Sequence, residues 1–264
     1  MFARASSLLA AVALAGASPA AAAPQRIVSM NPCADAILAE VAAPAQIAAV
    51  SHWSHDPRAT SMDLALARRF PRHFGTAEEV LRHRPDLVIA GAHTPAATRA
   101  AFARLGIPVL LVGVPASVAQ SQAEVRAIAQ AVGRPEAGDR LNARIDRALA
   151  DAAVTGPRLP ALLRTPAGVV PGAGTLMDDL LVRTGFRNAA ADLGLASWDV
   201  LPVERLVLEP PVLLLADPKA APHPVLAKHD LPMAAFDMRL LNCGGPSIIP
   251  AVARLSAIRK AHAP

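Results

Sequence analysis

The stretch from Pro135 to Ala153, PEAGDRLNARIDRALADAA, constrains the fold more than any other part of the chain. Its apolar residues recur at the spacing of one helical face, with charged residues outside that face: Leu141, Ile145, Ala148, Leu149 and Ala152. Pro135 suits a first helical turn, and the Gly156-Pro157 pair ends the pattern. The pattern predicts one amphipathic helix about 30 Å long, which is the width of a small domain.

Alternating strand and helix patterns lie on both sides of this helix. Repeats of strand, helix and strand predict parallel sheets with helices on both faces. We therefore expect an α/β protein with an N-terminal lobe at 24–134, a linking helix at 135–155 and a C-terminal lobe at 156–264. A single sheet in which the long helix is one crossover connection remains the alternative. The segments 31–35 and 186–198 are expected to be loops.

The first 23 residues have the three parts of a secretory signal peptide: Arg4, an apolar run from Leu8 to Ala17, and a stretch of small residues. We expect cleavage after Ala22 or Ala23 and a periplasmic location. A membrane anchor is the alternative, but the apolar run is shorter than the ~20 residues that a membrane span needs.

Composition excludes several classes of function. The formal net charge is +5, and only 3% of the residues are aromatic, so basic residues are not interleaved with aromatic ones as in nucleic-acid-binding proteins. The chain contains no tyrosine, which excludes phenolate ligands to bare ferric iron. No nucleophile elbow, zinc-protease helix, phosphate-binding loop or dinucleotide-binding glycine motif is present. We therefore expect no catalytic activity and no cofactor.

Ligands of open parallel sheets bind beyond the carboxyl ends of the strands. The loops at these positions contain the candidate ligand-binding residues, which face one another if the two lobes enclose a cleft: Asn31, Cys33, His52, Trp53, His55, Asp56, His93, Trp198 and Cys243. The two tryptophans suit stacking on a flat ligand, although ordinary packing explains each one equally well.

Two features of this set have alternative explanations. Cys33 and Cys243 form either a disulfide or a pair of cleft-lining thiols, and a disulfide would restrict movement between the lobes. His52, His55, Asp56 and His93 would serve a secreted zinc enzyme or a binding protein for a bare divalent metal if they came together. Histidines in a loop are, however, more often exposed or hydrogen-bonded to the backbone.

The order of several segments is similar to that of the periplasmic substrate-binding proteins of ABC importers for cobalamin and ferric siderophores. The resemblance covers Arg26 to Arg259 and is carried by RIVSMNPCADAIL, IAAVSHWSHDP, EEVLRHRPDLVIAG, GAGTLMDDLLVRTGFRNAA and LPVERLVLEPPVLLLA. It implies two α/β lobes joined by a rigid helix, a metal chelate as the ligand, and an ABC permease as the partner of a monomeric receptor.

The resemblance also implies roles for single residues. Trp53 and Trp198 match aromatic positions on opposite walls of the cleft. Glu78 and Glu204 match surface glutamates, one on each lobe, that dock into arginines of the permease, although an acid also favours the first turn of any helix. The scarcity of arginine in the cleft loops favours a corrinoid such as cobalamin over a ferric siderophore or heme.

Overall fold

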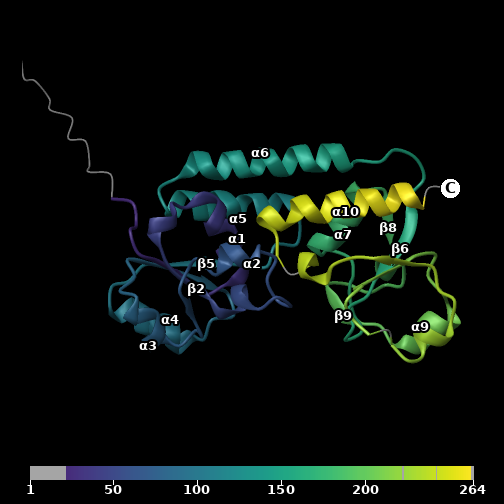
Figure 1. Cartoon of the computed structure of the whole chain (residues 1–264), viewed down its shortest axis with the longest axis horizontal. Helices are drawn as coiled ribbons and strands as arrows, with labels where there is room; N and C mark the ends of the chain where they lie inside the picture. Colours follow the sequence, from purple (N-terminus) through teal and green to yellow (C-terminus); the bar gives the residue numbers. More distant parts are fainter. Residues whose placement is uncertain (1–21, 222, 242, 263–264) are drawn as a thin grey trace, which may run out of the picture.

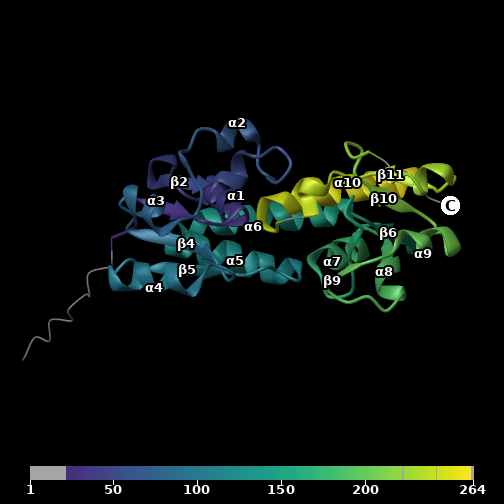
Figure 2. The same cartoon turned by 90° about the horizontal axis from the view of Figure 1, so that it is seen from below.

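The computed structural model describes residues 22–221, 223–241 and 243–262. Nearly all of the predicted signal peptide, 1–21, lies outside this part of the chain, as does Asn242. Two α/β lobes lie side by side, with their sheets well separated (Figure 2). The prediction of a two-lobed α/β fold is thus confirmed, and the single-sheet alternative is wrong.

The N-terminal lobe contains a parallel five-stranded sheet in the order β3-β2-β1-β4-β5. Its strands are β1 (Ile27–Ser29), β2 (Ile47–Ser51), β3 (Arg72–His73), β4 (Leu87–Gly91) and β5 (Val109–Val112). The strands alternate with helices α1 (Pro32–Val41), α2 (Leu64–Ala67), α3 (Ala77–Arg82) and α4 (Ala96–Arg104) and with short 3₁₀ turns at η1 (Pro44–Gln46) and η2 (His52–His55).

The C-terminal lobe contains a parallel four-stranded sheet in the order β11-β10-β6-β8 and an antiparallel pair, β7-β9. The strands are β6 (Leu159–Leu163), β7 (Val169–Pro171), β8 (Phe186–Asn188), β9 (Trp198–Val200), β10 (Leu214–Ala216) and β11 (Met233–Ala235). They are accompanied by α7 (Leu176–Arg183), α8 (Ala189–Asp192), α9 (Val203–Leu208) and the 3₁₀ turns η3 (Leu226–Lys228) and η4 (Met238–Leu241).

Three long helices hold the lobes together: α5 (Val118–Ala131), α6 (Pro135–Ala152) and α10 (Ile248–Ala261). Helix α6 is the predicted amphipathic helix, and it buries Leu141 and Ile145 against its neighbours. Helices α6 and α10 run together along the side of the molecule that lies away from α3 and α9 (Figure 1). The linking helix therefore does not connect the lobes alone.

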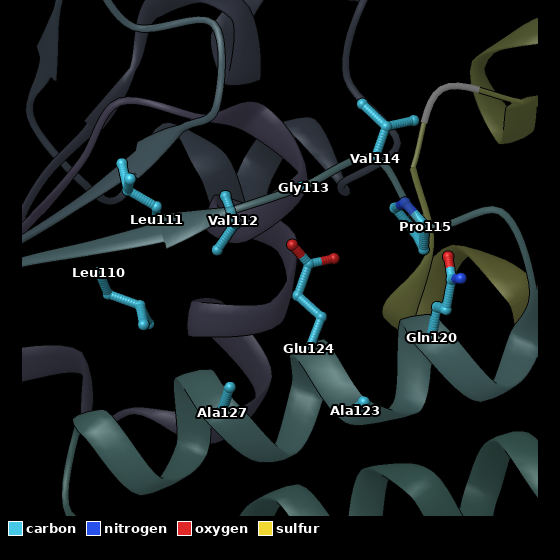
Figure 3. A pocket seen from close by; sticks show the side chains of 10 residues that line it. All are labelled: Leu110, Leu111, Val112, Gly113, Val114, Pro115, Gln120, Ala123, Glu124 and Ala127. Atoms are coloured by element: carbon cyan, nitrogen blue, oxygen red, sulfur yellow. The ribbon is translucent and has the colours of Figure 1, made fainter. Parts of the chain in front are cut away.

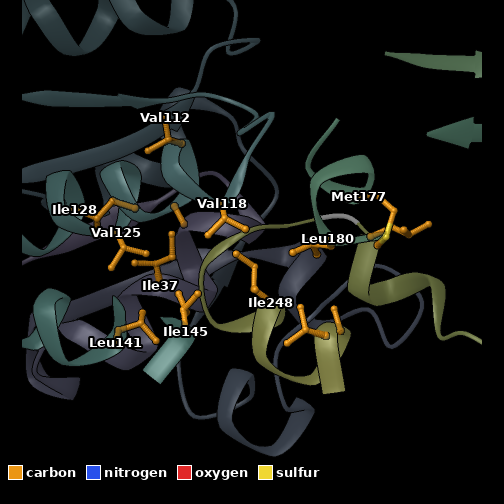
Figure 4. Close-up of a cluster of buried hydrophobic side chains, with 14 of the residues drawn as sticks. Ile37, Val112, Val118, Val125, Ile128, Leu141, Ile145, Met177, Leu180 and Ile248 are labelled. Atoms are coloured by element: carbon orange, nitrogen blue, oxygen red, sulfur yellow. The ribbon is translucent and has the colours of Figure 1, made fainter. Parts of the chain in front are cut away.

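Helix α10 contacts both lobes. At its start, Ile248 is fully buried in a hydrophobic cluster that also contains Ile37 of the N-terminal lobe and Leu180 of the C-terminal lobe (Figure 4). Near its end, Arg259 donates hydrogen bonds to the carbonyls of Gly185 and Pro157, at 3.1 and 2.8 Å. One continuous core thus runs through both lobes.

The segment before α10 is fixed to the N-terminal lobe. Cys243 forms a disulfide with Cys33 at the start of α1, and the backbone N–H of Gly245 donates to the Ser121 hydroxyl at 2.7 Å. Gly245 has a φ of +62°, and a Cβ there would lie 2.7 Å from Ile37 Cγ1. Glycine is therefore required where this segment, η5 (Gly245–Ser247), crosses α1.

Two of the expected loops are partly helix or strand. The segment 31–35 is not a loop, because α1 begins at Pro32 and the Asn31 side chain caps it by accepting from the N–H groups of Cys33 and Ala34. The segment 186–198 contains β8 and α8. Within the described residues, no helix is both long enough and apolar enough to cross a bilayer.

Candidate functional site

A cavity of about 500 Å³ lies between the lobes. Its walls come from the segment after β5, from the start of α7, from β9, and from the segment that carries the disulfide. The lining includes Val114 and Pro115 of the N-terminal lobe, Thr175 and Trp198 of the C-terminal lobe, and Cys243. This position, at the carboxyl ends of parallel strands, is where ligands of such sheets bind.

A second cavity of about 430 Å³ continues the first, because Trp198 and Leu241 line both. Pro57 and Arg58 of the N-terminal lobe form one side of it, and residues after β6, β10 and β11 form the other. The Trp198 indole is 43% exposed and stands where the two cavities meet. The cleft therefore has room for a large ligand, with one aromatic side chain near its centre.

The cations of the second cavity are already paired with carboxylates. Asp237 pairs with Arg239 at 2.7 Å and with Lys219 at 3.3 Å, and these bonds to Arg239 and Lys219 lower the pKa of Asp237 to about 2, against the smaller effect of burial. Arg58 pairs with Asp56 at 3.4 Å. Three cations, Arg58, Lys219 and Arg239, and two carboxylates, Asp217 and Asp237, line this cavity. Asp56 pairs with Arg58 from outside the lining, so each of the three cations already has a carboxylate partner.

A buried carboxylate on α1 holds the loop that follows β2 in place. Asp35 is fully buried on α1, and its Oδ2 accepts hydrogen bonds from the Ser51 N–H at 2.9 Å and from the Ser54 hydroxyl at 2.6 Å. Desolvation outweighs these hydrogen bonds and raises the pKa of Asp35 to about 7. The hydrogen bonds fix the turn that presents Trp53 at the carboxyl edge of the sheet.

The residues of that turn form an aromatic cluster. The His52 ring lies 4.5 Å from the Trp53 ring and 4.9 Å from the Phe74 ring, measured between centroids. Trp53 and Phe74 are 49% and 61% exposed, respectively. Neither residue lines the two cavities between the lobes, so this cluster forms a separate aromatic surface on the N-terminal lobe.

The other predicted site residues are dispersed. Trp198 and Cys243 line the cleft, whereas Asn31 caps α1 and His93 lies exposed after β4. The Nε2 atom of His55 is buried without a hydrogen-bond partner. Among the residues that the structure describes, no three His, Cys, Asp or Glu side chains are grouped as metal ligands, so the ligand set that the zinc hypothesis requires is not assembled there.

The two cysteines are joined, with their Cα atoms 5.0 Å apart. The alternative of two cleft-lining thiols is therefore wrong, because neither sulfur is a thiol. Cys243 is 4% exposed and contributes to the wall of the cleft as half of the disulfide.

A smaller cavity of about 310 Å³ flanks the cleft and shares Val114 and Pro115 with it (Figure 3). The Glu124 side chain extends from α5 toward Gly113 in this cavity (Figure 3). Burial raises the pKa of Glu124 to about 6, against a hydrogen bond from the Gly113 backbone that lowers it. The flanking cavity is otherwise mostly apolar.

The charged residues of the cleft were not predicted from the sequence: Arg58, Asp217, Lys219, Asp237 and Arg239. A signal for them was available, because Asp217 directly follows β10 and Asp237 follows β11 by two residues. The rule that ligands bind at the carboxyl ends of strands therefore applied to these strands as well.

Solved structures with a similar fold include heme-binding and vitamin B12-binding proteins. The periplasmic heme-binding protein RhuT from Roseiflexus sp. RS-1 is 24% identical, with a TM-score of 0.68, and the match covers 88% of this chain and 98% of RhuT. The periplasmic vitamin B12-binding protein BtuF of Vibrio cholerae is 18% identical, with a TM-score of 0.71 and coverage of 90% and 97%. A periplasmic heme-binding protein from Pseudomonas aeruginosa is 20% identical, with a TM-score of 0.71 and coverage of 91% and 94%.

These identities support the fold alone, and no curated protein matches the sequence. The sequence itself matches the family model described as "Periplasmic binding protein" over residues 27–230, which is most of the chain. The fold, the cleft between the lobes and this match agree, and the chain belongs to the periplasmic binding protein family.

Proposed function

We propose that this chain is the periplasmic substrate-binding component of an ABC importer and that its ligand is a metal chelate, with a corrinoid such as cobalamin preferred. The observation that carries this proposal is the pair of connected cavities between the lobes, about 500 and 430 Å³, with the Trp198 indole where they meet. An indole offers a flat apolar face to a macrocycle. The receptor performs no chemistry on the ligand.

The ion pairs in the cleft favour a corrinoid over a ferric siderophore or heme. Lys219 and Arg239 are already paired with Asp237, and Arg58 with Asp56. An anionic chelate would have to replace these ion pairs, whereas the amide groups of a corrinoid can hydrogen-bond to them as they stand. Structural relatives that bind vitamin B12 and heme are consistent with a macrocyclic ligand.

The permease is expected to bind the side of the molecule that carries α3 and α9. Each of these helices has an exposed glutamate in its first turn, Glu78 on α3 and Glu204 on α9. The two helices lie on separate lobes and on the side opposite α6 (Figure 1). Two carboxylates on separate lobes suit a partner with arginines at a fixed spacing.

Titration calorimetry with cobalamin, cobinamide, heme and a panel of ferric siderophores tests the ligand. We expect the corrinoids to bind with the highest affinity. Absorbance of the protein as isolated is a second measurement, since corrinoids and ferric chelates are coloured. Absence of binding to every member of the panel would contradict the proposal, and stoichiometric, tightly held zinc would favour an enzyme instead.

A further inference from the structure

A cavity of about 660 Å³, larger than either cavity of the cleft, lies within the C-terminal lobe rather than between the lobes. It is enclosed by the carboxyl end of β6, by β10, and by the connection from β10 to β11. It shares Thr165, Pro166, Asp217 and Ala220 with the second cavity of the cleft. A ligand in the cleft therefore has direct access to it.

Arg164 lies in the wall of this cavity, immediately after β6. Its Nε atom is buried without a hydrogen-bond partner, and its guanidinium forms no ion pair with any described residue. Desolvation lowers the pKa of Arg164 from its ordinary value, but an arginine remains protonated. A buried N–H without a partner costs free energy, and an anionic acceptor would recover it.

The chain around Arg164 is built to hold the guanidinium in place. The Thr165 N–H donates to the Val169 carbonyl at 2.8 Å, and the Gly168 N–H donates to the Thr165 carbonyl at 2.9 Å. Gly168 has a φ of +86°, and a Cβ there would lie 3.0 Å from Nη2 of Arg164. A tight turn with glycine at this position therefore leaves the space that the guanidinium occupies.

The other walls supply a second donor and an apolar surface. The Nδ1 atom of His223 accepts from the Val225 N–H at 3.3 Å, which leaves the Nε2–H of the neutral ring as a donor. Asp217, the acid at the shared edge, already accepts from the Lys219 N–H at 2.9 Å. Leu214 and Leu226 are buried in the apolar wall. Asp230 also lines the cavity, but it is exposed to solvent. The unpaired Arg164 and the apolar wall together suit a group with an acidic end and an apolar body.

We propose that this cavity is an oxyanion subsite in which Arg164 binds the acidic side arm of the chelate held in the cleft. The inference rests on the proposed function. In cobalamin the arm is the phosphodiester that carries an aromatic base, and cobinamide lacks it. The same chemistry would bind a free anion, so inorganic phosphate is the second source to test.

The test compares wild type with Arg164→Gln, with Arg164→Lys, and with Arg140→Gln, which removes the same charge from an exposed position on α6. Loss of a charge-assisted hydrogen bond corresponds to about a 10- to 100-fold change in affinity. We expect Arg164→Gln to weaken cobalamin binding by this factor in titration calorimetry and to leave the affinity for cobinamide unchanged. Arg164→Lys should retain part of the affinity, and Arg140→Gln all of it.

Thermal melting must first show that the variants are folded. If Arg164→Gln then weakens the binding of cobalamin and cobinamide equally, or changes the binding of neither, the subsite proposal is overturned. If wild type binds neither corrinoid, the proposed ligand fails, and the subsite is judged with inorganic phosphate alone. Phosphate binding that is lost in Arg164→Gln and kept in Arg140→Gln would then support a free-anion site. No phosphate binding by wild type would refute it.

Discussion

Trp198 is the single side chain on which binding in the cleft should depend most. It lines both cavities, whereas Trp53 packs against His52 outside them. We expect Trp198→Ala to weaken corrinoid binding by about 2 kcal/mol, roughly 30-fold, from lost apolar contact and stacking. Trp53→Ala is the matched control, because its indole is exposed to a similar extent and should contribute less. Titration calorimetry measures both, and a larger loss for Trp53 would place the ligand on the aromatic surface of the N-terminal lobe.

Asp35 should give the protein a measurable pH dependence. Its folded-state pKa of about 7 lies above the ordinary value of 3.8, so between about pH 4 and pH 7 the folded state holds a proton that the unfolded chain has released. The contribution of Asp35 to the free energy of unfolding is therefore fully present below about pH 4, and it is lost as the pH rises to about 7. The Asp35→Asn variant should lack this component in urea denaturation at pH 5 and pH 8. An identical pH dependence in both proteins would contradict the assignment.

At the scale of single residues, the sequence predicted Trp198 as a cleft residue but not Arg164 or Asp35. Trp198 was found because tryptophan is rare in this chain. Asp35 was placed in a loop, although Asn31 followed by Pro32 is a standard start of a helix. Nothing local distinguishes Arg164 from the other arginines, because its lack of a partner depends on how β6 and β10 come together.

Among the elements, η5 sets the position of α10 against the N-terminal lobe. Gly245→Ala would combine a positive φ with a Cβ 2.7 Å from Ile37. We expect a loss of roughly 3 kcal/mol in the free energy of unfolding. Gly194→Ala is the control, since Gly194 has a φ of +77° with open space around it and should cost only roughly 1 kcal/mol. Equal losses in urea denaturation would show that the contact with Ile37 contributes nothing.

Helix α6, which has a strong local signal, was predicted well. Helices α5, α6 and α7 have apolar periodicity, and Ser117 and Thr175 cap α5 and α7 by accepting from backbone N–H groups. The short strands β3, β7 and β9 were not predicted as strands, because two or three residues give no periodicity and their pairing depends on distant partners. The contact of α10 with both lobes was missed for the same reason.

For the molecule as a whole, the Cys33–Cys243 disulfide joins positions separated by 210 residues. A cross-link over so long a loop restricts the unfolded chain strongly, and removing a native disulfide typically costs roughly 2 to 5 kcal/mol. The Cys33→Ser, Cys243→Ser double variant should lose free energy of unfolding in that range. Unchanged stability in urea denaturation would mean that the packing of η5 alone holds the two lobes in register.

The docking surface is also a property of the whole molecule, because it needs both lobes. We expect Glu78→Ala and Glu204→Ala to lower transport about 10-fold in a reconstituted importer while leaving ligand affinity unchanged. Glu136→Ala, on the exposed start of α6 at the opposite side, is the control and should transport normally. Loss of ligand affinity in parallel with transport would contradict the docking role.

The packing of η5 against α1 and α5 has a consequence for when the protein can fold during its synthesis and export. The first lobe lacks part of its own core until Ile248, near the end of the chain, arrives to fill it. Ile248 leaves a ribosome or a secretion channel long after Ile37, so the N-terminal lobe cannot reach its final packing before residue 248 has emerged. The N-terminal lobe therefore matures only after the segment that carries Cys243 and Ile248 has emerged, and the bond between Cys33 and Cys243 can form only then.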